Sequence, residues 1–476
     1  MNRKKAILFV FAVIWFAATA HADIGVVIAD PTTIGSSAYT HAGHSLIYLS
    51  GVCPDTPVHA RLCKAGEQGS IVTAYPDFKE WKPYAWNMAP LSIYLNGLSS
   101  PDNRLLYASR KVEAALDDSA RNHYLKPVCE GRCPDMQHAY WHDMIAATAD
   151  RDIFIYAVRS THAQDQAIVD WLNADANVNH YNGVTRNCAV FTRELVNLIF
   201  PHAVHRDFLN DLGMMSPKAA ARSFSRWATK HPELGFYSMH FAQQPGDLPR
   251  AGMACNGTEA AIHIKKYLIP AAMIGDHEVA GSFFVAYFLT GRFDLYKEYR
   301  RYPAPTVVSI ESEARRAKDQ ANERQWRVLR TSLDEIRSEK TGTPESWAAY
   351  RERVREFQAF ASANDIPQEK KKKLPSELAD APVAIDEDGN PWLILGTETG
   401  QQRVGASSAN LLAGGSNPRL AFELILGRVS YVLEAKNHLQ EDFAAFREDW
   451  SLLQAAYDRL HRAPAAEDWP VVASTK

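Results

Sequence analysis

Cys188 is the residue of this 476-residue chain whose type and surroundings best suit covalent chemistry. It follows Asn187, and an apolar periodicity predicts a helix from Cys188 to Phe200. A cysteine at a helix N-terminus lies near unpaired backbone amides and the helix dipole, which both favour the thiolate. The same amides can stabilise an oxyanion. We therefore predict that Cys188 is a nucleophile, with Asn187 in its catalytic site; Asn187 and Thr185 are both plausible caps for the helix.

A thiol nucleophile needs a general base, and His44 is the histidine best placed for this role. It opens a predicted strand that ends at Leu49, directly after Gly43, which leaves room for close approach of another segment. A histidine at the end of a core strand that faces a helix start can reach the thiol of that helix. His41, in the preceding loop, is an alternative base.

The chain has six cysteines, and four of them form two short-range pairs that we predict as disulfides: Cys53 with Cys63, and Cys129 with Cys133. Cys188 and Cys255 are left over. A disulfide between these two is the alternative that would remove the nucleophile. If it does not form, an exported protein would carry a free thiol at a helix start, which is unusual for that compartment.

Residues 1–22 have the pattern of a secretory signal peptide. A basic start precedes an apolar run and an A-x-A cleavage site: Arg3, Lys4 and Lys5, then Ala6 to Ala18, then Ala20-His21-Ala22. The alternative is a membrane anchor, for which the apolar run is short. Without the signal, 49 basic residues (52 less 3) face 55 acidic ones, a net charge near −6. We expect an exported protein, in the periplasm or outside the cell, that does not bind nucleic acid.

The elements that must position these residues alternate between strands and helices. We predict strands at 45–49, 70–75 and 152–158, and helices at 105–124, 164–173 and 188–200. This mixture indicates an α+β catalytic domain over residues 23–240, extended by a mostly helical region over 241–305. A charged, mainly helical accessory module is expected over 306–476, with a small β-hairpin at 383–395.

The two candidate segments together resemble the circularly permuted NlpC/P60 group, which has a papain-like fold and includes relatives of lecithin:retinol acyltransferase. The segments are Ala42-Gly43-His44-Ser45 and Arg186-Asn187-Cys188-Ala189. They are most similar to the DUF4105-type periplasmic domain at the N-terminus of Lnb-type lipoprotein N-acyltransferases. Ala189 stands where that domain often has threonine, and no multi-span membrane region follows. The resemblance covers residues 40–200 at most, and implies a permuted papain-like fold with Cys188 as nucleophile and His44 as base.

The third residue, which would orient the imidazole of His44, is left open by the sequence. His59 follows His44 by 15 residues and is similar in place to a second histidine of the acyltransferase relatives, but it lies inside the predicted disulfide loop. Thr73 and Tyr75, on the next predicted strand, are the other candidates.

Together these features predict an exported cysteine-dependent hydrolase or acyltransferase. Its substrate would be an ester or amide in a cell-envelope lipid, a lipoprotein or a peptidoglycan peptide. One alternative is an inactive binding or scaffold protein with a papain-like shell. We expect no cofactor, because the chain has no glycine-rich phosphate-binding loop, and no serine hydrolase, because it has no G-x-S-x-G motif.

A zinc-dependent hydrolase is the second alternative. His138 and His142 are spaced to share one helix face, and Asp143 follows them. Ala139 occupies the position of the glutamate in an H-E-x-x-H motif, so we expect no metal.

Overall fold

The structure is a computed structural model, and it describes residues 22–32, 42–75, 84–124, 143–174, 176–178, 180–183, 185–211, 214–263, 281, 285–304, 344–364, 366, 376–397, 400–434 and 443–462. The predicted signal peptide up to residue 21 lies outside these ranges. So do the predicted pair Cys129 and Cys133, the alternative base His41, and the candidate zinc ligands His138 and His142.

A six-stranded sheet forms the centre of the N-terminal part. Its strand order is β6 (Asn87–Pro90), β5 (Ser70–Thr73), β2 (His44–Leu49), β1 (Ala22–Ala29), β7 (Ile153–Ser160), β8 (Tyr237–Phe241). Every neighbouring pair is antiparallel. The central strands are apolar on both faces, so both faces of the sheet must be covered. The α+β class expected from the sequence is confirmed.

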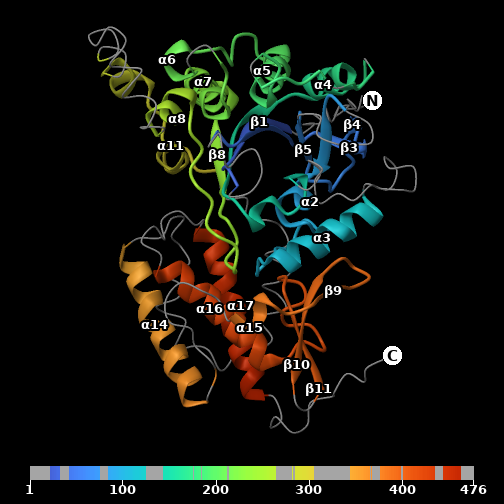
Figure 1. Cartoon of the computed structure of the whole chain (residues 1–476), viewed down its shortest axis with the longest axis vertical. Coiled ribbons are helices and arrows are strands. Elements are labelled where there is room, and N and C mark those ends of the chain that lie inside the picture. The colour runs from blue at the N-terminus through green and yellow to red at the C-terminus, as the bar shows by residue number, and fades with distance from the viewer. Residues whose placement is uncertain are drawn as a thin grey trace, which may run out of the picture.

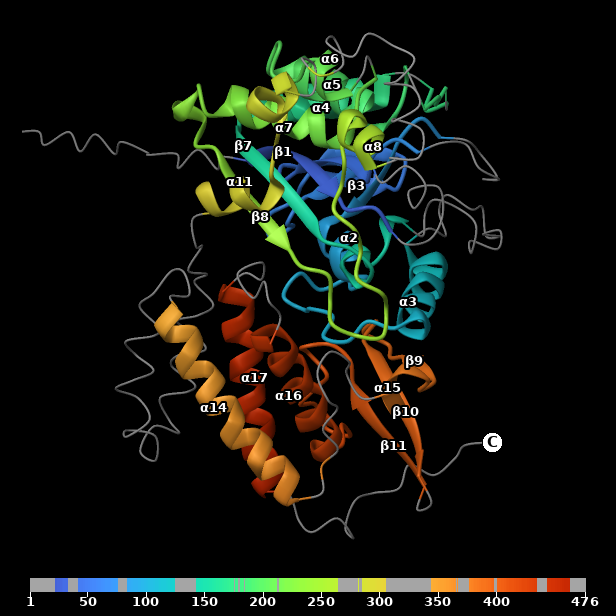
Figure 2. The same cartoon turned by 60° about the vertical axis from the view of Figure 1, so that its left-hand side comes forward.

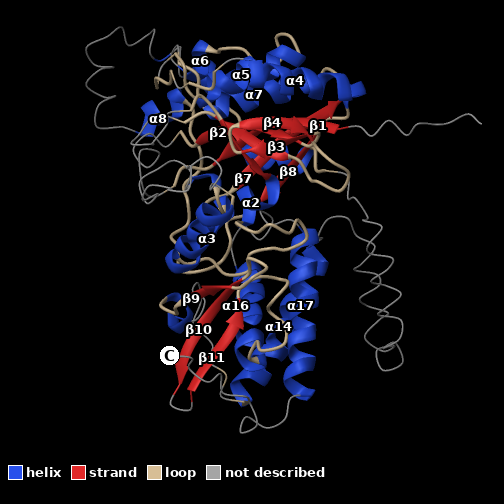
Figure 3. Ribbon diagram, turned by 90° about the vertical axis from the view of Figure 1, so that its right-hand side faces the viewer, coloured by secondary structure: helices blue, strands red, loops and turns tan. Residues whose placement is uncertain are grey.

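Three helices cover one face: α4 (His162–Ala174), α5 (Cys188–Ile199) and α7 (Pro217–Ala228) (Figure 1, Figure 3). Alternate side chains of β1, such as Val26 and Ile28, pack with these helices in one core. The intervening Val27 belongs to a second core on the opposite face, with Tyr94 of α2 (Leu91–Asn96). The two-residue period of the strands thus sends one set of side chains to each layer.

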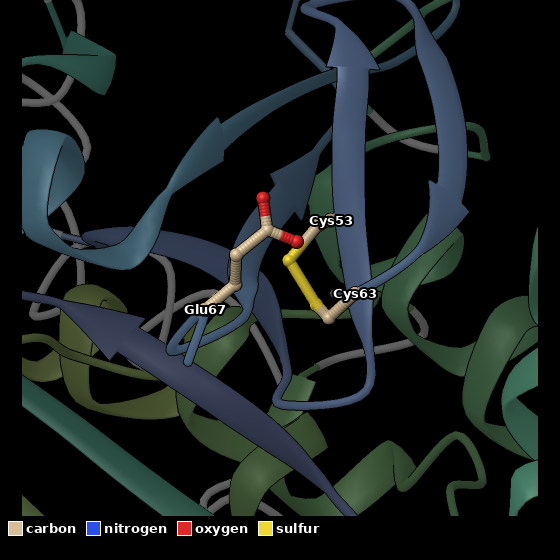
Figure 4. A group of neighbouring side chains, drawn as sticks. All are labelled: Cys53, Cys63 and Glu67. Carbon is tan, nitrogen blue, oxygen red and sulfur yellow. A yellow bond between two sulfur atoms is a disulfide. The ribbon is translucent and has the colours of Figure 1, made fainter. Parts of the chain in front are cut away.

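Shorter elements complete the N-terminal part. They are the hairpin β3 (Val52–Thr56) and β4 (His59–Leu62), the helices α3 (Arg110–His123), α6 (Phe208–Asp211), α8 (Gly257–His263) and α11 (Leu295–Arg301), the 3-10 turns η3 (Ala147–Ala149) and η4 (Pro232–Leu234), and the π-helix η5 (Tyr287–Gly291). The predicted disulfide between Cys53 and Cys63 is present and closes the β3–β4 hairpin (Figure 4).

The C-terminal part is largely helical. It contains α14 (Pro344–Ala363), α15 (Ser376–Ala379), α16 (Pro418–Glu434), α17 (Phe443–Arg462) and the antiparallel sheet β9 (Val383–Ile385), β10 (Pro391–Thr397), β11 (Gly400–Gly405). Strands β9 and β10 form the predicted hairpin. Figure 2 shows this part below the six-stranded sheet, next to α3. No described helix has the length and apolarity needed to cross a bilayer.

Side chains of the C-terminal part share one core with α3 and the segment before it, including Leu106 and Val112. A buried ion pair joins Arg428 of α16 to Asp449 of α17, with Nε and Oδ2 2.6 Å apart. Arg104 also binds Asp449, at 2.5 Å, and Arg428 donates to the carbonyl oxygen of Leu106. The two parts therefore meet through a continuous packed interface.

Candidate active site

The predicted helix start at Cys188 is confirmed, and Asn187 caps it. The backbone of Asn187 is extended, and its Oδ1 accepts from the amide of Val190 at 2.9 Å. Its Nδ2 donates to the carbonyl oxygen of Met215 at 2.9 Å, just before α7 begins. Asn187 therefore positions the helix that carries Cys188, and ties it to α7.

The thiol of Cys188 is buried, with 6 % of the residue exposed, and it forms no disulfide. Cys255 is also a free thiol, so the alternative Cys188–Cys255 bridge is absent. Burial raises the pKa of the Cys188 thiol above its ordinary value. The amides of Ser45 and Ala189 and the hydroxyl of Tyr181 form hydrogen bonds with the sulfur and oppose this shift. The net depression of the pKa that the sequence predicted is wrong, because burial outweighs the helix-start amides.

His44 is the first residue of β2 and lies opposite Ala29 of β1. The preceding Gly43 has φ +69°, and a Cβ there would lie 2.4 Å from the carbonyl oxygen of Ala29. Only glycine suits this backbone, which confirms the expected close approach. The imidazole stacks on Tyr75, with ring centroids 4.1 Å apart and an interplanar angle of 9°.

Thr73 fixes the tautomer of His44. Its hydroxyl donates to the carbonyl oxygen of Ser45 at 2.7 Å, which uses its single hydrogen. The same oxygen lies 2.8 Å from Nε2 of His44, so it must accept the Nε2–H of the imidazole. Nδ1 then keeps its lone pair and is the nitrogen that can act as a base. The register between β2 and β5 agrees with the stacking of His44 on Tyr75. If the antiparallel pairing Ile47↔Val72 is continued by three residues, His44 lies opposite Tyr75.

The imidazole is neutral at physiological pH. Burial lowers the pKa of His44 to about 3. The negative charge of Asp143 opposes this shift, and the positive charge of Arg151 reinforces it. Arg151 binds both Asp143, at 2.6 Å, and Asp150, at 2.8 Å, so one cation and two carboxylates lie together beside the site.

The backbone of β2 passes the start of α5 where β2 and β5 separate. The pairing of these strands begins at Ile47, so the amide of Ser45 is not used by β5. The carbonyl oxygen of Ser45 accepts from Thr73, and in a strand the amide of a residue points to the same strand edge as its carbonyl. The amide of Ser45 therefore points to this edge, where it binds the sulfur of Cys188. The hydroxyl of Ser45 faces α5 and lies 2.9 Å from Oγ1 of Thr192.

Within the described residues, Cys188 and His44 are not joined by a direct hydrogen bond. The thiol instead binds the amide of Ser45, the residue directly after His44. The imidazole of His44 is covered on one side by the ring of Tyr75, which stacks on it. Catalytic hydrogen bonds are often absent or long without substrate, so this arrangement is compatible with a nucleophile and its base.

A small pocket of about 250 Å³ opens beside the helix start. Tyr181 and Asn187 line it together with apolar and charged side chains: Ala74, Ala85, Val178, His180, Arg186, Val190, Phe191 and Glu194. The hydroxyl of Tyr181 also contacts the sulfur of Cys188, so one lining residue of the pocket touches the thiol, which is not itself part of the lining.

His59 lies elsewhere, in the hairpin β3–β4. Its side chain is 57 % exposed, and Nδ1 is 3.7 Å from Asp55. Thr73 instead binds Nε2 of His44, the nitrogen that an orienting residue would hold. Thr73 is one of the alternatives that the sequence left open. Tyr181 was missed, although it stands only seven residues before Cys188.

The described residues offer one close group of metal-ligand types, and its chemistry does not suit a metal. Cys53, Cys63 and Glu67 have ligand atoms within 4.8 Å of one another. The two sulfurs are joined in the disulfide and cannot act as thiolates, as Figure 4 shows. Glu67 is held by two hydrogen bonds from Arg61, both 2.7 Å. Of the predicted zinc candidates, Asp143 is described, and it pairs with Arg151.

Comparisons of the chain with protein-family models, curated proteins and solved structures find no match. The likeness to the permuted NlpC/P60 group therefore stays a prediction based on two short motifs.

Proposed function

We propose that this chain is an exported acyl-transfer enzyme with Cys188 as nucleophile and His44 as general base. The observation that carries the proposal is a free thiol at a helix start that binds the amide of Ser45, the residue after a neutral histidine whose Nε2 is held by Thr73. A nucleophile, a base and a group that orients the base are the three parts that thiol catalysis requires.

The reaction would proceed through a thioester. The sulfur of Cys188 attacks the carbonyl carbon of an ester or amide while Nδ1 of His44 accepts the thiol proton. The oxyanion that develops is stabilised by donors at the helix start, among which the amide of Ala189 and the hydroxyl of Tyr181 already bind the sulfur. His44 then returns its proton to the leaving alcohol or amine, and water or an amine cleaves the thioester.

Both groups are neutral before reaction, since burial raises the pKa of Cys188 and lowers that of His44. The proton therefore moves during the attack, and no thiolate–imidazolium pair exists beforehand. In a site of low dielectric, the two opposite charges stabilise each other as they form together.

Two wider features support the proposal. The order of strand histidine before helix cysteine, on an antiparallel sheet, is what a permuted papain-like domain would have, and we propose that fold for residues 23–240. A disulfide at Cys53–Cys63 is typical of exported proteins and supports export. The substrates we propose are cell-envelope lipids, lipoproteins or peptidoglycan peptides.

Trapping the acyl-enzyme tests this proposal. We would incubate the mature protein with p-nitrophenyl octanoate and measure the intact mass, followed by peptide mapping. The expected result is one octanoyl group on Cys188, removable by neutral hydroxylamine, and none in Cys188→Ala. The buried thiol of Cys255 is an internal control, because it has no histidine partner among its described contacts. Acylation of Cys255 alone, or of neither cysteine, would overturn the proposal.

A further inference from the structure

A second and larger cavity, of about 630 Å³, lies among α7, α8 and η5. Figure 1 shows α7 and α8 near α6 and α11 at one end of the sheet. Much of its lining is apolar, from Met253, Ala254, Phe288 and Phe293. Cys255 also lines it, and burial raises the pKa of this thiol, which therefore stays protonated and weakly polar.

The buried charges of the cavity are already matched. Nζ of Lys218 lies 2.8 and 3.0 Å from the two carboxylate oxygens of Glu259. The hydroxyl of Tyr287 donates to the same carboxylate at 2.7 Å, and the amide of Asn256 donates at 3.2 Å. Because this network is satisfied internally, the cavity has no uncompensated charge to attract a polar ligand into its interior.

The mouth of the cavity combines apolar side chains with one exposed cation. Phe288 is 58 % exposed and Met253 is 47 % exposed, although both line the cavity. Arg292 is exposed and forms no ion pair with another described residue. The carboxylate of Asp294 caps α11 by accepting from the amide of Lys297 at 2.9 Å.

We propose that this cavity binds a single-chain anionic amphiphile, with the hydrocarbon chain inside and the carboxylate at Arg292. Pockets of about 300–1,000 Å³ with apolar walls and few polar groups are typical of small-molecule sites, and this cavity falls in that range. Exposed large apolar side chains around such a mouth are a common mark of a binding site. The inference does not depend on Cys188, and it goes beyond the proposed acyl transfer.

The test uses the full mature chain with Cys188→Ala, so that acylation cannot contribute. The probe is the fluorescent fatty acid cis-parinaric acid, displaced by saturated fatty acids of 8 to 16 carbons below their micelle concentrations. We expect affinity to increase by about fourfold for each methylene that the cavity buries. Bound palmitate should also slow the alkylation of Cys255 by N-ethylmaleimide, measured by peptide mapping.

Two variants locate the site. Cys255→Phe fills the cavity and should weaken palmitate binding by about tenfold or more. Arg292→Gln changes only an exposed side chain and should weaken it by about two- to fivefold at low salt, whereas the matched control Arg300→Gln should not. Affinity that does not depend on chain length, or that is the same in Arg292→Gln and Arg300→Gln, would overturn the proposal. So would unchanged alkylation of Cys255 with palmitate bound.

Discussion

Replacing Thr73 by valine tests whether this hydroxyl orients the catalytic imidazole. Thr73 is fully buried, and its hydroxyl makes two hydrogen bonds, one accepted from Nε2 of His44 and one donated to Ser45. Valine has nearly the same shape, so it removes both bonds without opening a cavity. An unpaired buried polar group costs about 1–3 kcal/mol, so the two groups left behind should lower the free energy of unfolding by about 2–6 kcal/mol.

The rate should fall as well. If one hydrogen bond of about 1.4 kcal/mol holds the imidazole in the reactive tautomer, its loss slows the acylation of Cys188 by about tenfold. Urea unfolding measures the first effect, and mass-resolved acylation by p-nitrophenyl octanoate measures the second. Thr73→Ser is the control, because it keeps the hydroxyl and loses one methyl group worth about 1 kcal/mol.

A double-mutant cycle with His44 separates orientation from general damage. In a His44→Gln background, Thr73→Val should have no further effect on the acylation rate of Cys188, because the group that Thr73 orients is gone. Equal rates for Thr73→Val and Thr73→Ser would refute the role of the hydroxyl. A full tenfold effect of Thr73→Val in the absence of His44 would refute it too.

Three further changes have outcomes that follow from the structure. Burial raises the pKa of Asp30 from 3.8 to about 8, so the folded state keeps a proton that the unfolded state loses; stability therefore falls between about pH 4 and pH 8. The variant Asp30→Asn should not show this loss. Its free energy of unfolding at pH 7, measured by urea titration, should exceed that of the wild type by up to about 4 kcal/mol. Tyr181→Phe removes a hydrogen bond to sulfur and should slow acylation of Cys188 by about fivefold. Replacing Cys53 and Cys63 by serine, which opens a loop of sequence separation 10, should cost about 2–3 kcal/mol of stability and leave the acylation rate unchanged.

Each of these outcomes can fail in a recognisable way. A stability difference between Asp30→Asn and wild type that is independent of pH would show that Asp30 does not titrate as its burial requires. An acylation rate that is unchanged in Tyr181→Phe would remove Tyr181 from the site. A large fall in the rate on loss of the disulfide would show that the β3–β4 hairpin supports the site directly.

The local features of the site could be predicted from the sequence. Asn187 is a residue type that caps helices, and the apolar spacing after it marks the helix that carries Cys188. Gly43 before His44 indicated the close approach that the structure shows. These features depend on neighbours in the chain, which a sequence displays directly.

The features that depend on distant packing could not be predicted. The raised pKa of Cys188 follows from its burial in the folded chain, and the amide that partly opposes it belongs to Ser45, which is 143 positions away in the sequence (188 less 45). The choice of Thr73 over His59 follows from the register between β2 and β5, which two short apolar strands do not specify. Strand β1 was missed because it directly follows the apolar signal pattern and is buried on both faces, so it shows no alternation.

The dependence of Cys188 acylation on His44 is the most direct test of the proposed chemistry. We would measure the rate of acyl transfer from p-nitrophenyl octanoate to Cys188 at pH 7 in the wild type and in His44→Gln, with His123→Gln, an exposed histidine, as the matched control. If His44 is the general base, its loss should slow acylation by about 10²–10⁴-fold, and His123→Gln should match the wild type. Equal rates in His44→Gln and the wild type would contradict the assignment of base and nucleophile.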